Sequence, residues 1–302
     1  MSKIIGLFPG QGSQKVGMGQ DLFDSSEIAK KYFNDANEIL GFDLAKICFE
    51  GPKEKLTSTE IVQPAILTMS TICFEMAKAK KDFQLEIAAG HSLGEYSALV
   101  AAGVLSFENA LTLVHHRGQY MQSAVAQGEG AMLAVLGKSP EEIEEQLKGI
   151  NGILEIANIN APGQVVISGQ KSSADEFKEK CSGWKLIELE VSAPFHCALM
   201  KPAEEKLSVE IDNTEFKDAK FPVCINFNAK PTTKADEFKQ GLKDQVCGQV
   251  RWVESIENSI SEYGIDTSIE FGSGNVLTGL MKRINKDLNK INISNLSTLE
   301  KF

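Results

Sequence analysis

Apolar and polar residues follow two patterns along the chain, one typical of buried strands and the other of amphipathic helices. Short, largely apolar runs at residues 4–8 and 86–89 predict strands in the interior of a sheet, and a further strand is predicted at residues 267–271. Between these runs, apolar residues recur every three or four positions, as they do in helices that cover a sheet. This alternation of strands and helices predicts an α/β fold with a central, mostly parallel sheet.

Capping residues and glycines mark the ends of several predicted helices. A helix over residues 26–40 ends at Gly41, and Ser106 is a candidate N-cap for the helix that follows it. Another helix is expected to start near Pro64, because proline is tolerated in a first turn. The other predicted elements outside the middle of the chain are a strand at 221–226 and helices at 64–80, 93–102, 107–124, 198–211, 253–263 and 275–284.

The middle of the chain has a different order of elements, which is strand, helix, strand, strand, helix, strand. These predicted elements lie at residues 131–136, 140–148, 153–157, 164–168, 174–181 and 185–191. This is the order of a ferredoxin-like βαββαβ unit. We therefore predict a small domain, residues 128–196, inserted into a large α/β domain that is formed by residues 1–127 and 197–302.

Composition and charge restrict the possible functions. The 302 residues are 42% hydrophobic and 24% charged, which is ordinary for a soluble globular protein. The net charge of -10 argues against non-specific nucleic-acid binding, and no apolar run approaches the ~20 residues of a membrane span. The first apolar run is expected to be a strand and not a secretory signal. Because the six cysteines are scattered, without a Cys-x-x-Cys pair or a Cys/His cluster, we expect no metal site and a cytoplasmic location.

A glycine-rich loop over residues 10–19 follows the first predicted strand. Two nucleotide-binding motifs have a glycine-rich loop at this place. The dinucleotide fingerprint needs a third glycine where Lys15 stands. The phosphate-binding loop needs Lys and then Ser or Thr after Gly17, where Met18 and Gly19 stand. Both motifs are excluded, and what remains is a loop whose backbone N–H groups can approach a ligand closely.

The sequence Gly90-His91-Ser92-Leu93-Gly94 lies between a predicted strand and a predicted helix. A Gly-x-Ser-x-Gly in that setting is the pattern of a nucleophile elbow, in which a tight turn exposes the serine hydroxyl at a helix N-terminus. Free N–H groups and the helix dipole favour negative charge there. Ser92 is therefore a candidate nucleophile for attack on a carbonyl.

A serine needs a base to take its proton, and the chain has four histidines. His91 adjoins Ser92, and neighbouring side chains diverge, so it cannot easily reach the hydroxyl. His115 and His116 lie in the middle of a predicted helix, where packed or surface positions are expected. His196 follows a proline where the chain leaves the inserted domain, beside the cleft between the two domains. We predict that His196 is the general base and acid.

Arg117 is the second informative side chain. Most arginines on helices are solvated surface charges, but a buried arginine in a serine acyl-transfer site would bind a carboxylate of the acyl group through a bidentate pair. This alternative predicts selectivity for an acidic acyl group.

Several sequence blocks, taken together and in order, resemble the malonyl-CoA:acyl-carrier-protein transacylase family over essentially the whole chain. The blocks are Phe8-Pro9-Gly10-Gln11-Gly12-Ser13-Gln14, Gln63-Pro64-Ala65, the elbow with Glu95-Tyr96-Ser97-Ala98, Arg117-Gly118, residues 160–169, residues 196–202, Val250-Arg251-Trp252 and residues 276–280. The resemblance implies an α/β-hydrolase-like large domain with a ferredoxin-like insert.

The resemblance also implies a role for each matching residue. Ser92 is the nucleophile and His196 its base, and the backbone N–H groups of Gln11 and Leu93 form the oxyanion hole. A backbone carbonyl orients the histidine in place of an Asp, and alignment on the tryptophan assigns it to Gln245. Because this group is main chain, the identity of that side chain is expected to matter little. The family's usual proline before Val-Arg/Gln-Trp is replaced here by glutamine.

The resemblance implies that Arg117 holds the malonyl carboxylate, and we expect Gln63 and His91 to bind substrate as well. Phe195 either narrows the acyl pocket against an α-methyl group or packs in the core.

The implied reaction is a ping-pong transfer of malonyl from malonyl-CoA to the phosphopantetheine thiol of acyl carrier protein, with no cofactor. We expect a monomer with no nucleic-acid or membrane partner. Because carrier protein, CoA and this chain are all acidic, docking requires a local basic patch. Lys185, Lys201, Lys282 and Arg283 are candidates, with solvated surface charge as the alternative.

Three other functions remain open at this point. A serine thioesterase or esterase usually has a carboxylate between its Ser and His, and the candidates Asp175, Glu176, Glu188 and Glu190 all fall within the insert. A non-catalytic module could bind carrier protein, although the residues of an active site are intact. An acyltransferase could use another extender such as methylmalonyl.

Overall fold

The larger sheet of the computed structural model, which describes residues 2–302, has six strands in the order β10-β9-β1-β2-β7-β8. The first five strands are parallel and the short β8 pairs antiparallel at the edge. The strands are β1 Ile4–Phe8, β2 Ile87–Gly90, β7 Val223–Cys224, β8 Pro231–Thr232, β9 Thr267–Phe271 and β10 Asn289–Ile293. The predicted central, mostly parallel sheet is therefore confirmed.

Alternate residues of the central strands contribute to two different hydrophobic cores. In β1, Phe8 packs into one core, whereas Ile5 and Leu7 pack into the other. In β2, Ala88 packs into the same core as Phe8, whereas Ile87 and Ala89 pack into the other core. Because both faces of the sheet are covered by helices, β1 and β2 in its centre are nearly continuous apolar runs in the sequence.

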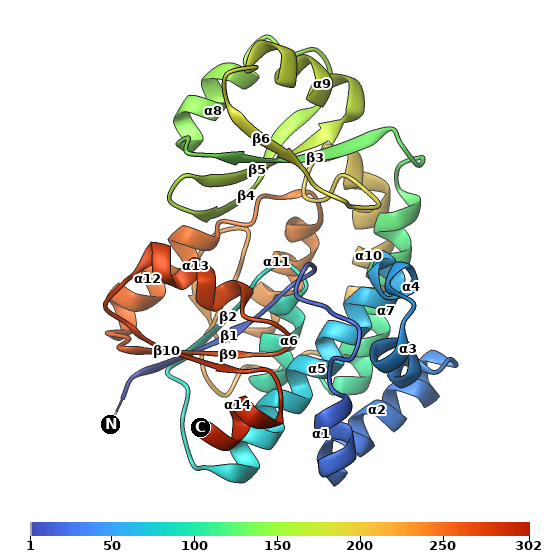
Figure 1. The fold of residues 1–302 in the computed structure, drawn as a ribbon, viewed down its shortest axis with the longest axis vertical. Helices are drawn as coiled ribbons and strands as arrows, with labels where there is room; N and C mark the ends of the chain where they lie inside the picture. Colours follow the sequence, from blue (N-terminus) through green and yellow to red (C-terminus); the bar gives the residue numbers. More distant parts are fainter. Residues whose placement is uncertain (1) are drawn as a thin grey trace.

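The helices of this part of the molecule surround the sheet (Figure 1). They are α1 Gln20–Ser25, α2 Glu27–Leu40, α3 Leu44–Glu50, α4 Lys53–Thr57, α5 Thr59–Lys80, α6 Gly94–Ala101, α7 Phe107–Ser123, α10 Lys201–Asn213, α11 Ala235–Cys247, α12 Trp252–Tyr263, α13 Val276–Ile284 and α14 Leu296–Lys301. The predicted caps are present, since Ser106 accepts a hydrogen bond from the backbone N–H of Asn109 and Gly41 ends α2 in a left-handed conformation. None of the helices in residues 2–302 is long and apolar enough to cross a membrane.

The prediction that a helix starts near Pro64 is wrong, because α5 begins at Thr59 and contains the proline. A proline inside a helix has no N–H for the carbonyl four residues earlier, which here belongs to Glu60. That carbonyl lies 3.0 Å from Nδ1 of His115 on the neighbouring α7, which donates to it. A side chain from another helix therefore satisfies the group that the proline leaves free.

Other predicted boundaries also differ from the structure. The helix expected at 198–211 is divided into a 3₁₀ turn, Ala198–Met200, and α10. The helix expected to be the last is followed by β10 and α14, and the predictions omitted α1, α3, α4, α11 and β8.

The second sheet has four antiparallel strands in the order β4-β5-β3-β6 and is covered by two helices on one face (Figure 1). Its elements are β3 Gly130–Leu136, α8 Pro140–Leu147, β4 Leu154–Ala161, β5 Gln164–Gln170, α9 Lys171–Lys180 and β6 Lys185–Glu188. This is the predicted order of elements, with β4 longer and β6 shorter than expected. The division into domains at residues 128 and 196 stays a prediction.

The two sheets are joined beside the carboxyl end of β2. The backbone N–H of Val250 donates to Ala157 of β4 at 2.8 Å, and the N–H of Ile159 donates back to Val250 at 3.1 Å. His91, directly after β2, contacts Asn160 of β4 at 2.7 Å. The elbow therefore faces a cavity between the two parts of the molecule.

Candidate active site

The elbow between β2 and α6 forces Ser92 into a left-handed backbone conformation, with φ of 51°. The glycines on either side are required for close approach. A Cβ on Gly90 would lie 1.9 Å from the carbonyl oxygen of Gly94, and a Cβ on Gly94 would lie 1.9 Å from that of Phe8. The turn is therefore as tight as the sequence predicts, and it directs the Ser92 hydroxyl into the cavity.

His196 lies beside this hydroxyl. Its Nε2 is 2.7 Å from Oγ of Ser92, and its Nδ1 is 2.9 Å from the backbone oxygen of Gln245. Since a carbonyl can only accept, Nδ1 carries the proton and Nε2 is free to accept one from the serine. Burial, and then the positive charge of Arg117, lower the pKa of His196 to about 3, so the ring is neutral at neutral pH.

Arg117 of α7 is also buried next to Ser92, and its side chain is only 2% exposed. Its Nη2 donates to Oγ of Ser92 at 3.1 Å and to Oε1 of Gln245 at 2.9 Å, and its Nη1 donates to Oε1 of Gln63 at 2.7 Å. The guanidinium lies 5.7 Å from the centre of the Tyr96 ring. No carboxylate of residues 2–302 forms an ion pair with Arg117. The groups that accept hydrogen bonds from its guanidinium are all neutral.

The side chain of Gln245 does more than the sequence indicated. In addition to accepting from Arg117, it donates through Nε2 to the carbonyl of Ser92 at 3.0 Å and to Oε2 of Glu95 at 2.8 Å. The side chain is fully buried. The sequence-based expectation that its identity matters little considered only the main chain, whereas in the structure the same glutamine contacts the nucleophile, the histidine and the arginine.

Two residues of the site were missed from the sequence, Glu95 and Asn226. Oδ1 of Asn226 accepts from the backbone N–H of Ser92 at 2.7 Å, and its Nδ2 donates to the carbonyl of Gly90 at 2.7 Å. Its own backbone N–H donates to Oε2 of Glu95 at 3.0 Å. The signal for Glu95 is a single carboxylate in an otherwise apolar helix just after the elbow. Asn226 has no such signal, since its place depends on contacts between distant segments.

Gln11 and Leu93 both line the cavity beside Ser92. Within the described part of the chain, the backbone N–H of neither residue donates a hydrogen bond. Both N–H groups are therefore without protein acceptors, which an oxyanion hole requires.

The other expected substrate residues line the same cavity of about 160 Å³. Gln63 contacts Arg117, as described above. His91 lies with its ring 5.4 Å from that of Trp252, and desolvation lowers its pKa. Phe195 is 8% exposed and contributes to an apolar wall. The other apolar residues of this wall are Met121, Met132, Val166, Leu189 and Val191.

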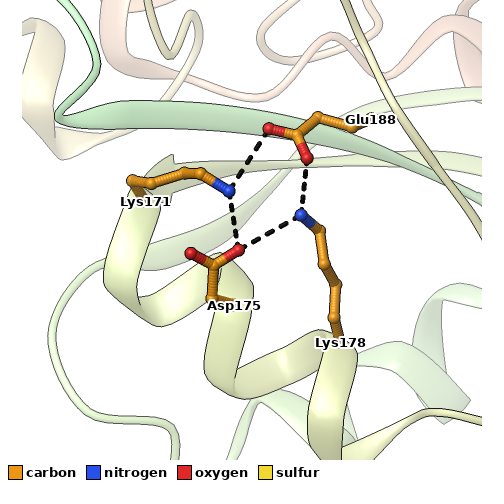
Figure 2. A network of polar contacts seen from close by, with 4 residues as sticks. All are labelled: Lys171, Asp175, Lys178 and Glu188. Atoms are coloured by element: carbon orange, nitrogen blue, oxygen red, sulfur yellow. Dashed lines mark hydrogen bonds and ion pairs between the residues drawn. The ribbon is translucent and has the colours of Figure 1, made fainter.

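Two of the four carboxylates considered for a hydrolase triad, Asp175 and Glu188, form ion pairs elsewhere. Figure 2 shows Asp175 and Glu188 in a network with two lysines of α9 on the outer part of the second sheet. Lys171 lies 2.6 Å from Asp175 and 3.4 Å from Glu188, and Lys178 lies 3.2 Å and 2.5 Å from the same two groups. Neither carboxylate contacts His196, whose Nδ1 is already bonded to a carbonyl.

The remaining histidines and basic candidates lie outside the cavity. His115 contacts α5, and His116 contacts the carboxylate of Glu210 on α10. Lys201 is paired with Glu204 at 2.6 Å, while Lys185 and Lys282 are exposed. Arg283 donates to Gln164 at 2.5 Å and to the carbonyl of Pro162 at 2.7 Å, so it joins α13 to the β4–β5 turn. In residues 2–302, no three His, Cys, Asp or Glu side chains are grouped so that they could hold a metal ion.

Comparison with known proteins gives the family. The model of the acyl transferase domain family matches residues 6–292. The malonyl CoA-acyl carrier protein transacylase of Bacillus subtilis (strain 168) is 44% identical over 306 residues, which cover 99% of this chain and 96% of that protein. This chain belongs to the acyl transferase family and, within it, to the malonyl CoA-acyl carrier protein transacylases. The Staphylococcus aureus (strain MW2) transacylase is 43% identical over 99% of this chain and 97% of its own length.

Solved structures of family members agree with the fold. An acyl carrier protein S-malonyltransferase from Vibrio cholerae superposes with a TM-score of 0.95 at 41% identity, covering 99% of both chains. A malonyl-transacylase in complex with a type II PKS acyl-carrier protein has a TM-score of 0.96 at 40% identity, covering 99% of this chain and 98% of that one. The protein is thus an acyltransferase, and the predicted resemblance is confirmed.

Proposed function

We propose that this protein transfers a malonyl group from malonyl-CoA to the phosphopantetheine thiol of acyl carrier protein through a malonyl ester on Ser92. One observation supports this most directly. The hydroxyl of Ser92 lies 2.7 Å from the neutral histidine that can take its proton and 3.1 Å from a buried guanidinium without a carboxylate partner. The names of the similar proteins agree with the proposal.

In the first half-reaction, Oγ of Ser92 attacks the thioester carbonyl of malonyl-CoA while Nε2 of His196 takes the serine proton. The carbonyl oxygen becomes negative and is stabilised by the backbone N–H groups of Gln11 and Leu93, and loss of one such donor typically costs ~10²–10³ in rate. The C–S bond then breaks, and His196 returns the proton to the leaving sulfur. Free CoA and the malonyl ester remain.

In the second half-reaction, the thiol of acyl carrier protein gives its proton to His196 and attacks the same ester carbonyl. The C–O bond breaks, and the proton passes from His196 to Oγ of Ser92. Neither half-reaction involves a redox change, so we propose that no cofactor is needed. We also propose a cytoplasmic location, with which six free cysteine thiols agree.

Arg117 provides the selectivity for malonyl in this proposal. Its guanidinium carries a positive charge at all relevant pH values and can form two parallel hydrogen bonds to one carboxylate. Acetyl has no group that could accept these bonds. Apolar residues such as Met121 and Phe195 line the same cavity, and Arg117 is the only positively charged residue among those that line it in the described part of the chain.

The test is the intact mass of the protein after mixing with malonyl-CoA and, separately, with acetyl-CoA. We expect a malonyl adduct that disappears when carrier protein is added, with malonyl appearing on the carrier protein. The Ser92→Ala variant should give no adduct, and a persistent adduct in that variant would refute the nucleophile assignment. Release of free malonate without any gain from carrier protein would instead indicate a thioesterase.

A further inference from the structure

The buried guanidinium of Arg117 interacts electrostatically with the carboxylate of Glu95, and the side chain of Gln245 lies between the two groups. The two side chains are joined through the amide of Gln245, whose Oε1 accepts from Arg117 at 2.9 Å and whose Nε2 donates to Glu95 at 2.8 Å. Glu95, like Gln245, has no exposed surface. A buried charge is unfavourable without compensation, so a guanidinium and a carboxylate connected through one amide stabilise each other.

The charge on Glu95 also fixes the direction of the Gln245 amide. With a carboxylate on one side and a guanidinium on the other, only the NH₂ group can face Glu95 and only the oxygen can face Arg117. The same residue offers its backbone oxygen to His196 at 2.9 Å. Glu95 thereby acts on the reacting groups through its neighbour, which makes it a positioning residue.

The two oxygens of Glu95 have different surroundings. Oε2 accepts from the backbone N–H of Asn226 and from Gln245, whereas Oε1 has no hydrogen-bond partner in residues 2–302. Burial raises the pKa of this carboxyl to about 7, against the smaller, opposite effects of its hydrogen bonds and of Arg117. Oε1 is the atom that is free to carry a proton.

We propose that Glu95 is the internal counter-ion of Arg117 and that it takes up a proton from solvent when the malonyl carboxylate binds to Arg117. This inference rests on the function proposed above. In the free enzyme above about pH 7, one positive and one negative group share the buried site. A bound malonyl carboxylate adds a second negative charge, and protonation of Oε1 restores neutrality. Acetyl brings no charge, so its binding leaves the proton count unchanged.

The other titratable groups around Glu95 do not change charge near neutral pH. Burial raises the pKa of Tyr96 on the same helix and raises that of Cys224 on β7 to about 12. The pKa values of His91 and His196 are lowered, that of His196 to about 3. Arg117 on α7 stays protonated. Glu95 is therefore the group whose ionisation responds to a new charge in the cavity.

The transfer chemistry itself does not consume protons. In the first half-reaction the serine proton goes to the sulfur of CoA, and an ordinary thiol with a pKa of ~8.5 keeps it near pH 7. Proton uptake that accompanies formation of the malonyl-enzyme therefore reports a protein group and not the reaction.

The experiment mixes wild type with malonyl-CoA or acetyl-CoA in weakly buffered solution and follows a pH indicator, with intact mass giving the amount of acyl-enzyme. The proton uptake with malonyl-CoA should exceed that with acetyl-CoA by about half a proton per acyl-enzyme near pH 7 and by close to one proton near pH 8. The difference is the relevant quantity, because part of the released CoA thiol ionises near pH 8 and does so equally in both reactions. The Glu95→Gln variant should form the malonyl-enzyme without this excess, while Glu108→Gln, an exposed carboxylate at the start of α7, should behave like wild type.

A pH profile provides the second readout. In wild type, the preference for malonyl-CoA over acetyl-CoA in the acylation step should fall up to about tenfold per pH unit above pH 7, because Glu95 becomes charged and competes for Arg117. In Glu95→Gln the preference should not depend on pH. A structural role alone would lower both rates equally and leave the profiles parallel.

The outcomes separate the two proposals. If wild type forms a malonyl-enzyme with no excess of proton uptake over the acetyl reaction between about pH 7 and pH 8, the role of Glu95 is wrong and the function stands. If malonyl-CoA gives no covalent adduct at all, the proposed function is wrong. Because the uptake measured on wild type decides the first question, the inference remains falsifiable even if the Glu95→Gln variant does not fold.

Discussion

Ser92 and His196, whose side chains meet at 2.7 Å, both have left-handed backbone conformations, with φ of 51° and 59°. Residues other than glycine disfavour this region by about 1–2 kcal/mol each. The surrounding structure must therefore hold both residues in place, as the glycines of the elbow and the buried Gln245 do here.

This strain predicts an unusual order of stability at Ser92. Ser92→Ala and Ser92→Gly both lose the hydroxyl and its hydrogen bonds, but only glycine adopts a positive φ without cost. We expect Ser92→Gly to have a free energy of unfolding about 1 kcal/mol higher than Ser92→Ala, measured by urea denaturation.

Ser208 in the middle of α10 is the matched control, because its backbone is helical. There alanine should be more stable than glycine by about 1 kcal/mol. If alanine were also the more stable replacement at position 92, as it is expected to be at position 208, the backbone of Ser92 would not be strained.

We predict that truncation of the Gln245 side chain lowers the activity. Gln245→Ala leaves the backbone oxygen that binds His196 but removes the hydrogen bonds to Arg117, Ser92 and Glu95. A hydrogen bond to a charged group contributes about 1.5–3 kcal/mol, so we expect kcat/KM for malonyl transfer to fall roughly 10- to 100-fold.

Gln240→Ala on the exposed side of α11 is the control for this variant. Gln240 contacts only the carboxylate of Asp244, at 2.8 Å, and its loss should leave kcat/KM within about twofold. If Gln245→Ala were as active as wild type, the backbone carbonyl alone would be sufficient. The expectation that the side chain at this position matters little would then be correct.

The buried His196 predicts how stability depends on pH. Its pKa is lowered from 6.5 to about 3 in the folded protein, so below pH 6.5 the unfolded chain binds a proton that the folded protein does not. The contribution to stability is complete above pH 6.5 and is lost as pH falls towards 3, with a slope of up to about 1.4 kcal/mol per pH unit.

His196→Asn removes the titrating ring and keeps a residue that tolerates a positive φ. The free energy of unfolding of wild type should therefore fall more steeply than that of the variant between about pH 6 and pH 4. Parallel curves in urea denaturation would show that the ring is not held in its neutral form.

The sequence predicted those features that depend on local pattern. The strand predicted at 267–271 coincides with β9, and a glycine follows it directly in the sequence. The helix α11 was missed although it carries Gln245, because Gly241 within it disfavours a helix. A Cβ at Gly241 would lie 2.6 Å from Ile225, so packing between segments requires the residue that local propensity opposes.

The same distinction holds for the site. Ser92 was predicted from a motif, and His196 was predicted by elimination among the few histidines. The structure places the two side chains in contact. Glu95 and Asn226 were not found, because the hydrogen bonds that Glu95 accepts from Asn226 and from Gln245 join three separate segments. No periodicity or spacing in one sequence encodes such tertiary contacts.

Arg117 gives the last prediction, which concerns acyl selectivity. Arg117→Ala removes one or two charge-assisted hydrogen bonds to the malonyl carboxylate, each contributing about 1.5–3 kcal/mol, and none to acetyl. The ratio of malonyl to acetyl transfer should therefore fall by roughly ten- to ten-thousand-fold, measured as kcat/KM for the two CoA esters. Arg117→Lys keeps the charge but not the planar fork, so its ratio should lie between those of wild type and alanine.

Arg251→Ala is the matched control, because this half-exposed arginine pairs with Glu254 on the surface, at 2.5 Å, and does not line the cavity. Its ratio should equal that of wild type, since a surface ion pair contributes little. If Arg117→Ala also kept the wild-type ratio while forming acyl-enzyme, the guanidinium would serve only to hold Gln63, Gln245 and Ser92. The malonyl carboxylate would then have to bind elsewhere in the cavity.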